Sequence, residues 1–289
     1  MIENREIEKD EYWDLVIEPT KKLFQLNLKE VWKYRDLMLL FVKRDFVAQY
    51  KQTILGPLWH IIQPVFTTFV FLLVFGKIAN IPTDGIPPIL FFMSGITIWN
   101  YFSACLTATS STFVANAGIF GKVYFPRLVI PLSTVLSNLI KFLIQFALLV
   151  VVIIWFSFKG YQYYFGPFLF LIPVLIIMMA LLGLGLGIII SSLTIKYRDF
   201  TVLIGFAVQL LMYATPVAYP LSFLKTKSFA SWISYNPLSP ILEGFRFALF
   251  NKGDFQIHNL MYSTAVIIIV LFFGLLMFNK VERNFMDTV

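Results

Sequence analysis

An all-helical, polytopic membrane fold with six transmembrane helices is predicted by the composition, the length of the apolar segments and the placement of charge. Hydrophobic residues fill 58% of the 289 positions, charged residues fill only 13%, and the mean hydropathy is +0.78. A soluble domain carries roughly 25% charged residues. This chain has too little polar surface to cover a water-soluble domain, whereas a bilayer solvates apolar surface directly.

Six segments are long and apolar enough to cross a membrane. About 20 predominantly apolar residues span the hydrocarbon core, and this requirement is met by residues 57–75, 88–109, 128–157, 167–194, 200–218 and 260–278. The third and fourth segments are long enough to tilt or to project beyond the bilayer. A single transmembrane domain at 57–289 is therefore expected, after a cytoplasmic tail at 1–27 and a helical segment at 28–56. No cleavable signal peptide is expected, since the first 20 residues are charged.

The distribution of Lys and Arg predicts the orientation. With the N-terminus inside, the cytoplasmic segments hold 16 of the 23 Lys and Arg residues and the opposite side holds six, while Lys141 falls within the third span. Cytoplasmic loops carry such an excess of positive charge. A multi-pass protein with both termini in the cytoplasm is predicted. The net charge of +7 follows from this topology, so no nucleic-acid partner is predicted.

The segment before the first span has helical periodicity. At 100° per residue, apolar side chains fall on one face: Val31, Tyr34, Met38, Phe41, Val42 and Phe46. Charged side chains fall opposite: Lys29, Lys33, Asp36, Lys43 and Arg44. This pattern predicts an amphipathic helix in the cytoplasmic interface. A solvated cytoplasmic helix is the alternative.

Two short cytoplasmic loops are candidate contact sites for a protein partner. Residues 117–127 (AGIFGKVYFPR) combine aromatic side chains with Lys122 and Arg127, and exposed apolar side chains are typical of a protein interface. A membrane-anchoring turn with basic flanks is the alternative. The loop at 195–199 is expected to contact the same partner or lipid head groups.

Residues 228–250 predict a re-entrant helical hairpin that enters from the outer face. The segment is apolar but interrupted by Pro237 and Pro240, and irregular backbone at membrane depth requires shelter by protein or by a wet cavity. Glu243 and Arg246 are three residues apart, so they are able to pair on one helix face. A structural role for this pair is favoured over substrate contact.

Nucleotide-binding and catalytic motifs are missing from the chain. No phosphate-binding loop of the G-x-x-x-x-G-K-[ST] type is present, and Gly183, Gly185 and Gly187 lie in an apolar span, where they predict close helix packing. A single cysteine, Cys105, and two histidines, His60 and His258, make a metal site improbable. We therefore expect a non-catalytic subunit without a cofactor of its own, driven by a partner.

Several short motifs together resemble the ABC-2 type permeases of the polysaccharide export family, which move O-antigens, capsules and teichoic acids. The motifs are Arg44-Asp45, Tyr50-Lys51-Gln52, Leu55-Gly56-Pro57-Leu58-Trp59, Gln63-Pro64, Phe125-Pro126-Arg127, Tyr197-Arg198-Asp199 and Tyr235-Asn236-Pro237-Leu238, followed by Arg246. They extend from about residue 30 to the end of the chain. Each motif alone is weak, but their order relative to the six spans is specific.

The resemblance implies an assembly and a cargo. Two copies of the permease would pair with two cytoplasmic ABC ATPase subunits, which would hold ATP and Mg. The cargo would be a polysaccharide, such as an O-antigen for lipopolysaccharide biosynthesis, carried on undecaprenyl diphosphate across the bacterial cytoplasmic (inner) membrane. A coupling helix in the ATPase groove would comprise Gly121, Lys122, Val123, Tyr124, Phe125, Pro126 and Arg127.

Two further sets of residues are candidates for substrate contact. Aromatic faces stack on sugar rings, and the candidates to line the passage are Trp59, Phe66, Trp99, Tyr101, Tyr213 and Tyr219. Ordinary packing is the alternative for each of them. Arg44 and Lys51 are candidates to attract the diphosphate of the carrier, and their alternative role is to satisfy the charge rule for cytoplasmic loops.

Three other functions remain open from the sequence. The first is an ABC-2 drug or lipid exporter, which the aromatic richness and the lack of a large outer domain disfavour. The second is a membrane-embedded glycan-modifying enzyme, which requires a polar catalytic cluster that the sequence does not contain. The third is a passive channel. The identity of the glycan does not follow from the sequence.

Overall fold

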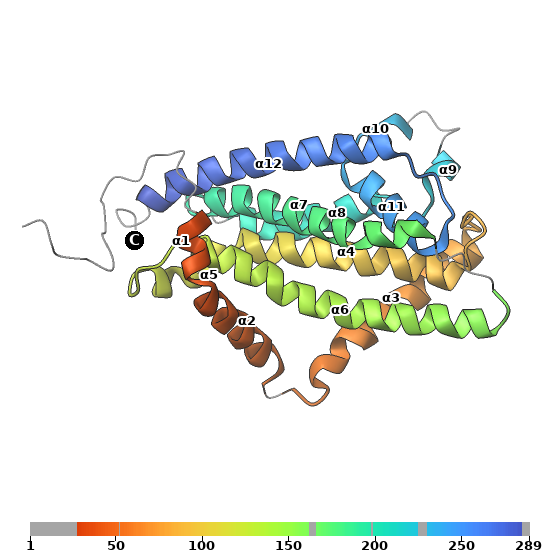
Figure 1. Cartoon of the computed structure of the whole chain (residues 1–289), viewed down its shortest axis with the longest axis horizontal. Coiled ribbons are helices and arrows are strands. Elements are labelled where there is room, and N and C mark those ends of the chain that lie inside the picture. Colours follow the sequence, from red (N-terminus) through yellow and green to blue (C-terminus); the bar gives the residue numbers. More distant parts are fainter. Residues whose placement is uncertain (1–27, 52, 162–165, 198, 225–229, 285–289) are drawn as a thin grey trace, which may run out of the picture.

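The computed structural model describes residues 28–51, 53–161, 166–197, 199–224 and 230–284. All regular secondary structure in this part of the chain is helical. The longest helices run side by side, with α4, α6, α7 and α12 forming the body of the bundle (Figure 1). The predicted all-helical class is confirmed.

Five helical segments are long and apolar enough to cross a membrane, among the described residues. They are α3 (Trp59–Phe71) with its flanking turns η1 (Gly56–Leu58) and η2 (Leu72–Ile78), α4 (Pro88–Ser110), α6 (Val129–Phe158), α7 (Leu171–Thr194) with η3 (Pro167–Phe170), and α12 (Ile257–Asn284). Each coincides with a predicted span to within a few residues, except that α12 is extended at both ends. The polytopic membrane class is therefore confirmed.

The fifth predicted span is shorter than expected. Helix α8 (Phe200–Tyr213) has 14 residues and is about 21 Å long at 1.5 Å per residue. It ends before Thr215-Pro216 because proline lacks a backbone N–H and disfavours the helical conformation of the residue before it. The structure thus has five long apolar helices and one shorter apolar helix, and residues 214–220 leave the helix.

Helix α4 is the centre of the bundle. In its most apolar stretch 78% of the residues are buried, against 22% for α6 and for α12. It packs against α3, α6, α7, α8 and α11. Its mean hydropathy of 1.5 is nevertheless the lowest of the five long helices, and that of the α7 segment is 2.8. The core of this protein is therefore less apolar than its lipid-facing exterior.

The glycines of α7 allow its neighbours to approach closely. A Cβ on Gly183 would lie 2.9 Å from the Cβ of Cys105, and a Cβ on Gly187 would lie 2.6 Å from the Cβ of Thr109, both on α4. On the other side, a Cβ on Gly185 would lie 3.0 Å from Val270 of α12. The predicted role of this glycine run in close helix packing is confirmed.

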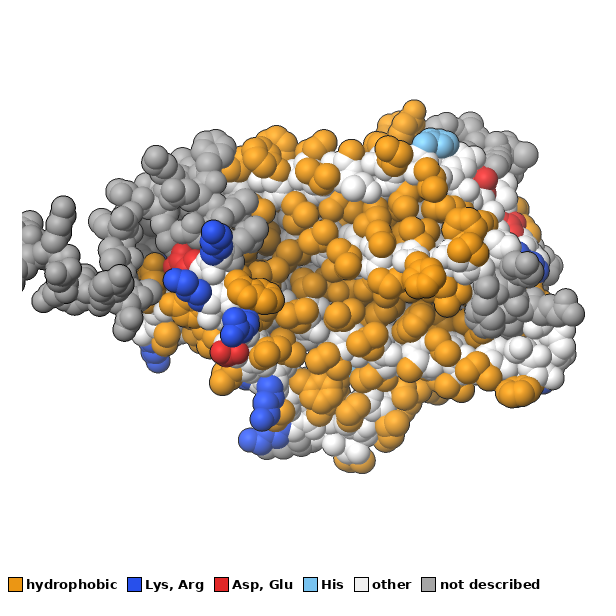
Figure 2. Space-filling view, in the orientation of Figure 1, with side chains coloured by type: hydrophobic (Ala, Val, Ile, Leu, Met, Phe, Trp, Pro, Cys, Tyr) orange, Lys and Arg blue, Asp and Glu red, His pale blue; other side chains and the backbone are white. Residues whose placement is uncertain are grey.

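The surface has the pattern expected of a membrane protein. Apolar side chains cover the middle of the face shown in Figure 2, and charged side chains lie toward its two ends. Most of the charges on this face gather over α1 (Leu28–Lys33) and α2 (Arg35–Tyr50), at the end of the bundle where α12 finishes (Figures 1 and 2).

The predicted amphipathic segment is broken at Tyr34, between α1 and α2. Its expected apolar face packs on the protein: Val31, Phe41 and Val42 are buried. Lys33 and Lys43 are exposed, as predicted. Helix α2 lies against α6. Whether the helix lies in a lipid interface stays a prediction.

The predicted hairpin at 228–250 contains two described helices, α10 (Ala230–Ser234) and α11 (Leu238–Phe250), and its first two residues lie outside the described part. Pro237 precedes α11 and Pro240 lies in its first turn, where a missing N–H costs little. Helix α11 is buried along nearly its whole length and contacts α4, α7 and α12. Helix α9 (Leu221–Leu224) precedes this pair.

Candidate functional site

The candidate coupling segment 121–127 is not helical. The helix at this place is α5 (Thr112–Phe120), which continues α4 after a break and ends just before Gly121. The expectation of a helix at 121–127 is wrong, because Gly121 ends α5 and Pro126 cannot continue a helical hydrogen-bond ladder. The segment divides in two: Gly121, Lys122, Val123 and Tyr124 are exposed, whereas Phe125, Pro126 and Arg127 are buried.

The buried half of this segment is fixed between α2 and α12. The ring of Phe125 lies 5.8 Å from Phe41 of α2 and 5.8 Å from Phe120. Arg127 donates from Nη1 to the backbone carbonyl of Glu282 at 2.8 Å, and its Cζ lies 5.5 Å from the ring centroid of Phe120. Burial lowers the pKa of Arg127, and Glu282 opposes this shift. These contacts connect the exposed residues 121–124 to α2 and to the end of α12 through buried side chains.

Arg44 and Lys51, the candidate diphosphate contacts, differ in their surroundings. The guanidinium of Arg44 donates from Nε and Nη2 to Asp45 at 2.9 and 2.7 Å, and it lies 4.7 Å from the ring centroid of Phe41. Lys51 follows α2 and is exposed. The positive charge of Arg44 is therefore balanced by its neighbour.

The six candidate passage residues do not lie on one surface. Trp59 and Phe66 of α3 are exposed, and so is Tyr213 at the end of α8. Tyr219 is half-buried, and its hydroxyl donates to the carbonyl of Tyr213 at 2.7 Å. Trp99 and Tyr101 are 3% exposed in the core around α4. The first four residues are therefore accessible from outside the protomer, whereas Trp99 and Tyr101 are not.

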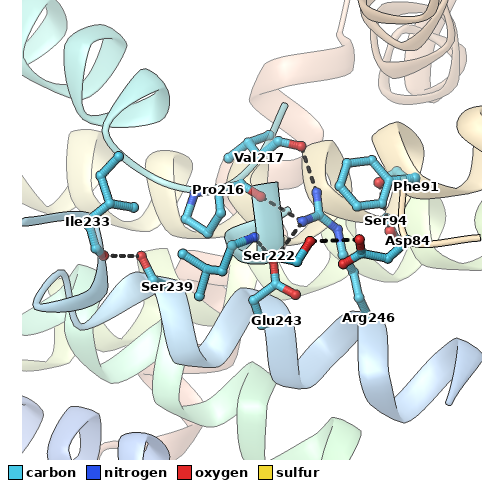
Figure 3. Close-up of polar contacts among 11 residues, drawn as sticks. Asp84, Phe91, Ser94, Pro216, Val217, Ser222, Ile233, Ser239, Glu243 and Arg246 are labelled. Atoms are coloured by element: carbon cyan, nitrogen blue, oxygen red, sulfur yellow. Dashed lines mark hydrogen bonds and ion pairs between the residues drawn. The ribbon is translucent and has the colours of Figure 1, made fainter. Parts of the chain in front are cut away.

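Arg246 and Glu243 form a buried ion pair on α11. Arg246 Nη1 lies 3.3 Å from Glu243 Oε1, and the side chains are 1% and 2% exposed. Figure 3 shows the guanidinium reaching from α11 into the segment that follows α8. There it donates to the carbonyls of Pro216 and Val217, each at 2.6 Å. The favoured structural role of the pair agrees with this geometry.

These side chains replace the hydrogen bonds that the backbone loses where α8 ends. Residues 215–218 are buried and not part of a long helix, so their carbonyls need partners. Asn236 donates from Nδ2 to the carbonyl of Ala214 and to Thr215 Oγ1, both at 3.0 Å. Arg246 donates to the carbonyls of Pro216 and Val217. The sequence did not reveal these contacts, although an arginine in an apolar segment after a Thr-Pro break was a usable signal.

A second group of polar contacts connects the loops at the same end of the bundle. Lys252 Nζ donates to the carbonyl of Gly85 at 2.7 Å and to the hydroxyl of Tyr161 at 2.8 Å, and that hydroxyl donates to the same carbonyl. Ser222 of α9 donates to Asp84 at 2.7 Å (Figure 3). A cavity of about 200 Å³ lies beside this group and is lined in part by Glu243, Asp254 and Asn259. Sequence reasoning missed this cluster, which is assembled from distant loops.

The described residues contain no group of three or more His, Cys, Asp or Glu side chains that could hold a metal ion. The described residues form a helical membrane body, and the exposed loop 121–124 lies at one end of it, next to buried side chains. The model of the ABC-2 type transporter family matches residues 36–250, which is most of the chain. The chain belongs to the ABC-2 type transporter family. It is a membrane-spanning, non-catalytic permease subunit.

The permease is similar to several named proteins over most of its length. It is 28% identical over 256 residues to the O-antigen export system permease protein RfbA of Klebsiella pneumoniae, covering 87% of this chain and 94% of that one. It is 26% identical over 266 residues to a protein of the same name from Myxococcus xanthus, covering 91% and 98%. It is 24% identical over 243 residues to the polysialic acid transport protein KpsM of Escherichia coli, covering 83% and 91%.

Proposed function

We propose that this chain is the permease of an ATP-driven exporter that moves a polysaccharide on undecaprenyl diphosphate out of the bacterial cytoplasm. The observation that carries the proposal is the similarity to permeases named for O-antigen export, which extends over 87% and 91% of the chain. A sugar polymer is rich in hydroxyl groups that hydrocarbon cannot solvate. Its crossing therefore requires a protein passage.

The same proposal assigns an orientation. The first described helix, α1, and the end of α12 lie at the same end of the bundle, which also carries α2 (Figure 1), and the Lys and Arg side chains of α1 and α2 gather there (Figure 2). The rule for cytoplasmic positive charge then assigns this end to the cytoplasm. Six crossings, counting α8 with the segment that follows it, agree with termini on one side.

Two copies of the permease would form the passage together. Helices α3 and α8 are the basis of this proposal, because both contact α4 on one flank and expose large apolar side chains on the other. Phe66 is 66% exposed and Phe206 is 63% exposed. The exposed candidates Trp59, Phe66, Tyr213 and the half-buried Tyr219 belong to these helices or follow them, so they would line the passage. Trp99 and Tyr101 would support the core instead.

The energy would come from two cytoplasmic ATPase subunits that hold ATP and Mg. Their docking site would be the exposed stretch Gly121–Tyr124, supported from below by Phe125 and Arg127. Val123 and Tyr124 are 58% and 51% exposed, and apolar side chains outside a bilayer favour a protein partner. Helices α10 and α11 would form the re-entrant hairpin at the outer side.

Depletion of the permease in its host tests this function. We expect polyprenyl-linked polysaccharide to accumulate on the cytoplasmic side of the membrane and to disappear from the cell surface. Unchanged surface polymer would instead favour a drug or lipid exporter. Polymer that reaches the surface with altered chemistry would favour a membrane-embedded glycan-modifying enzyme.

A further inference from the structure

Four buried polar atoms without a hydrogen-bond partner belong to α2, α3 and α6, and both α2 and α3 contact α6. They are the Tyr50 hydroxyl, His60 Nε2, Ser137 Oγ and Asn138 Nδ2. Only seven such side-chain atoms occur in the part of the chain that the structure describes. A buried polar group without a partner costs free energy, and folded proteins keep few of them. Four on three helices that pack together indicate a group that is missing from the protein alone.

These side chains come from three helices that meet. Helices α2 and α3 form a V beside α6, and both contact it (Figure 1). Tyr50 ends α2 and His60 lies in the first turn of α3, with their ring centroids 5.6 Å apart. Ser137 and Asn138 precede Lys141 on α6 by four and three residues, which places them on the same side of that helix. Lys141 of α6 interacts electrostatically with His60 of α3.

The charge of the cluster is positive. Among the described residues, none forms a hydrogen bond or a close ion pair with the Lys141 ammonium. Asp45 is the carboxylate that acts on it, but Asp45 already accepts two hydrogen bonds from Arg44. Burial raises the pKa of Tyr50, so its hydroxyl remains a neutral donor. The cluster thus offers one cation and several hydrogen-bond donors.

The cluster lies near the start of the first span. The first span begins at Gly56, and His60 is near its start. Helix α6 has 30 residues, a length of about 45 Å, whereas the hydrocarbon core is about 30 Å thick. Helix α6 is therefore longer than the core is thick. Lys141 interacts electrostatically with Asp45 of α2, which precedes the first span, and with His60 near the start of that span. Lys141 lies within the third span, as the sequence predicts, and a charge there needs an anionic partner because an unpaired charge within a membrane is costly.

We propose that Tyr50, His60, Ser137, Asn138 and Lys141 bind the phosphate or diphosphate head group of a membrane amphiphile that arrives in the inner leaflet. Phosphate oxygens accept strong hydrogen bonds from ammonium and amide groups. The exposed apolar side chains of α3 give the hydrocarbon tail a surface to follow. That the amphiphile is a polyprenyl diphosphate rests on the proposed function. Lys141, rather than Arg44, is then the main positive charge that binds the head group, because the guanidinium of Arg44 already donates two hydrogen bonds to Asp45.

Binding to the purified, full-length permease in neutral detergent tests this site. The probes are farnesyl diphosphate, farnesol and inorganic pyrophosphate, measured by equilibrium dialysis. We expect farnesyl diphosphate to bind more tightly than either of the other two. Lys141→Gln should weaken its binding by about tenfold or more, because a charge-assisted hydrogen bond is lost. Lys159→Gln, at the opposite end of α6, is the matched control and should bind as the wild type does.

A second variant separates loss of the site from loss of the fold. Lys141→Arg keeps the charge and should retain binding within about threefold, while the melting temperature shows that each variant is folded. Wild-type affinity in folded Lys141→Gln would overturn the proposal. Equal binding of pyrophosphate and farnesyl diphosphate would overturn the assignment to an amphiphile in favour of free phosphate.

This experiment uses neither polysaccharide nor ATP, so its result is independent of the export assay. Failure of the head-group site would appear as normal binding in Lys141→Gln, with export of polysaccharide still lost on depletion. Failure of the proposed function would appear as unchanged surface polymer, with Lys141-dependent binding intact.

Discussion

The guanidinium of Arg246 lies over the ring of Phe91, with Cζ 3.7 Å from the ring centroid. This contact joins α11 to the central helix α4. The same guanidinium donates hydrogen bonds to two carbonyls of the segment after α8, so a single side chain connects three parts of the protein. The local fold at this end of the bundle therefore depends on one positive charge.

Arg246→Met should destabilise the permease strongly. The change leaves Glu243 buried without its cation and two carbonyls without donors, and breaking such a pair costs about 3–5 kcal/mol. The expected result is a large fall in the midpoint of thermal unfolding of the detergent-solubilised protein. Arg35→Met, in an exposed pair with Asp36 at 3.9 Å, is the control and should change the midpoint little. Adding Glu243→Gln to Arg246→Met should recover part of the loss, and no recovery would contradict a buried pair.

Gly187→Ala should separate α4 from α7. The new Cβ would lie 2.6 Å from Thr109 Cβ and 3.1 Å from the carbonyl of Leu106, and overpacking of this kind costs about 1–3 kcal/mol. Gly205→Ala on α8 meets no atom within 4 Å and provides the control. Thermal unfolding should show a lower midpoint for the first variant only. Equal midpoints of the two variants would mean that α4 and α7 move apart at little cost, against the prediction.

Tyr124→Asp should abolish the productive contact with the ATPase without unfolding the permease. Tyr124 is exposed, whereas Arg127 behind it is buried and bonded to the end of α12. Co-purification with the ATPase and permease-dependent ATP hydrolysis should both fall in Tyr124→Asp, with the melting temperature unchanged.

Arg127→Glu, unlike Tyr124→Asp, should also lower the melting temperature. Its buried carboxylate would face the carbonyl of Glu282, to which Arg127 now donates a hydrogen bond. Tyr235→Asp, an exposed tyrosine toward the other end, should alter neither measurement. Normal coupling in Tyr124→Asp would remove residues 121–124 from the ATPase interface.

Lys252→Met should loosen the loops at the end of the bundle opposite α1 and α2. It removes donors to Gly85 and to Tyr161, and a hydrogen bond from a charged group contributes about 1.5–3 kcal/mol. Hydrogen exchange should become faster in residues 79–87 and stay unchanged in α4 and α6. Lys77→Met, exposed near the same end, is the control. Unchanged exchange in the loop would show that other contacts hold it.

Sequence predicted the spans well because a bilayer requires long apolar helices, and few other structures satisfy that requirement. The exception was α8. Hydropathy continues through residue 218, but Pro216 ends the helix earlier, and only the conformational restriction by proline carries that information.

Candidate passage residues were harder to predict. Helix α4 has apolar and small polar residues spread around it without a distinct polar face, so its sequence does not reveal that Trp99 and Tyr101 face the core. Phe66 on α3 has the same chemistry and is exposed. The partners of Arg246 lie 29 and 30 residues away in irregular backbone. Helical periodicity in the sequence does not predict contacts of this kind. The head-group cluster likewise required three helices to be placed in space.

The burial of α4 has a consequence for how the chain is made. A helix enters the bilayer during synthesis according to its own hydrophobicity, and α4 is the least hydrophobic of the five long helices, with serines and threonines in its interior-facing surface. It emerges from the ribosome before α6, α7 and α11, the neighbours that later cover it. The nascent chain therefore holds its future core in contact with lipid or insertion machinery until roughly residue 250 has been synthesised. Truncated chains should be cleared by membrane proteases, and the rate of biogenesis should be set by the arrival of the C-terminal half.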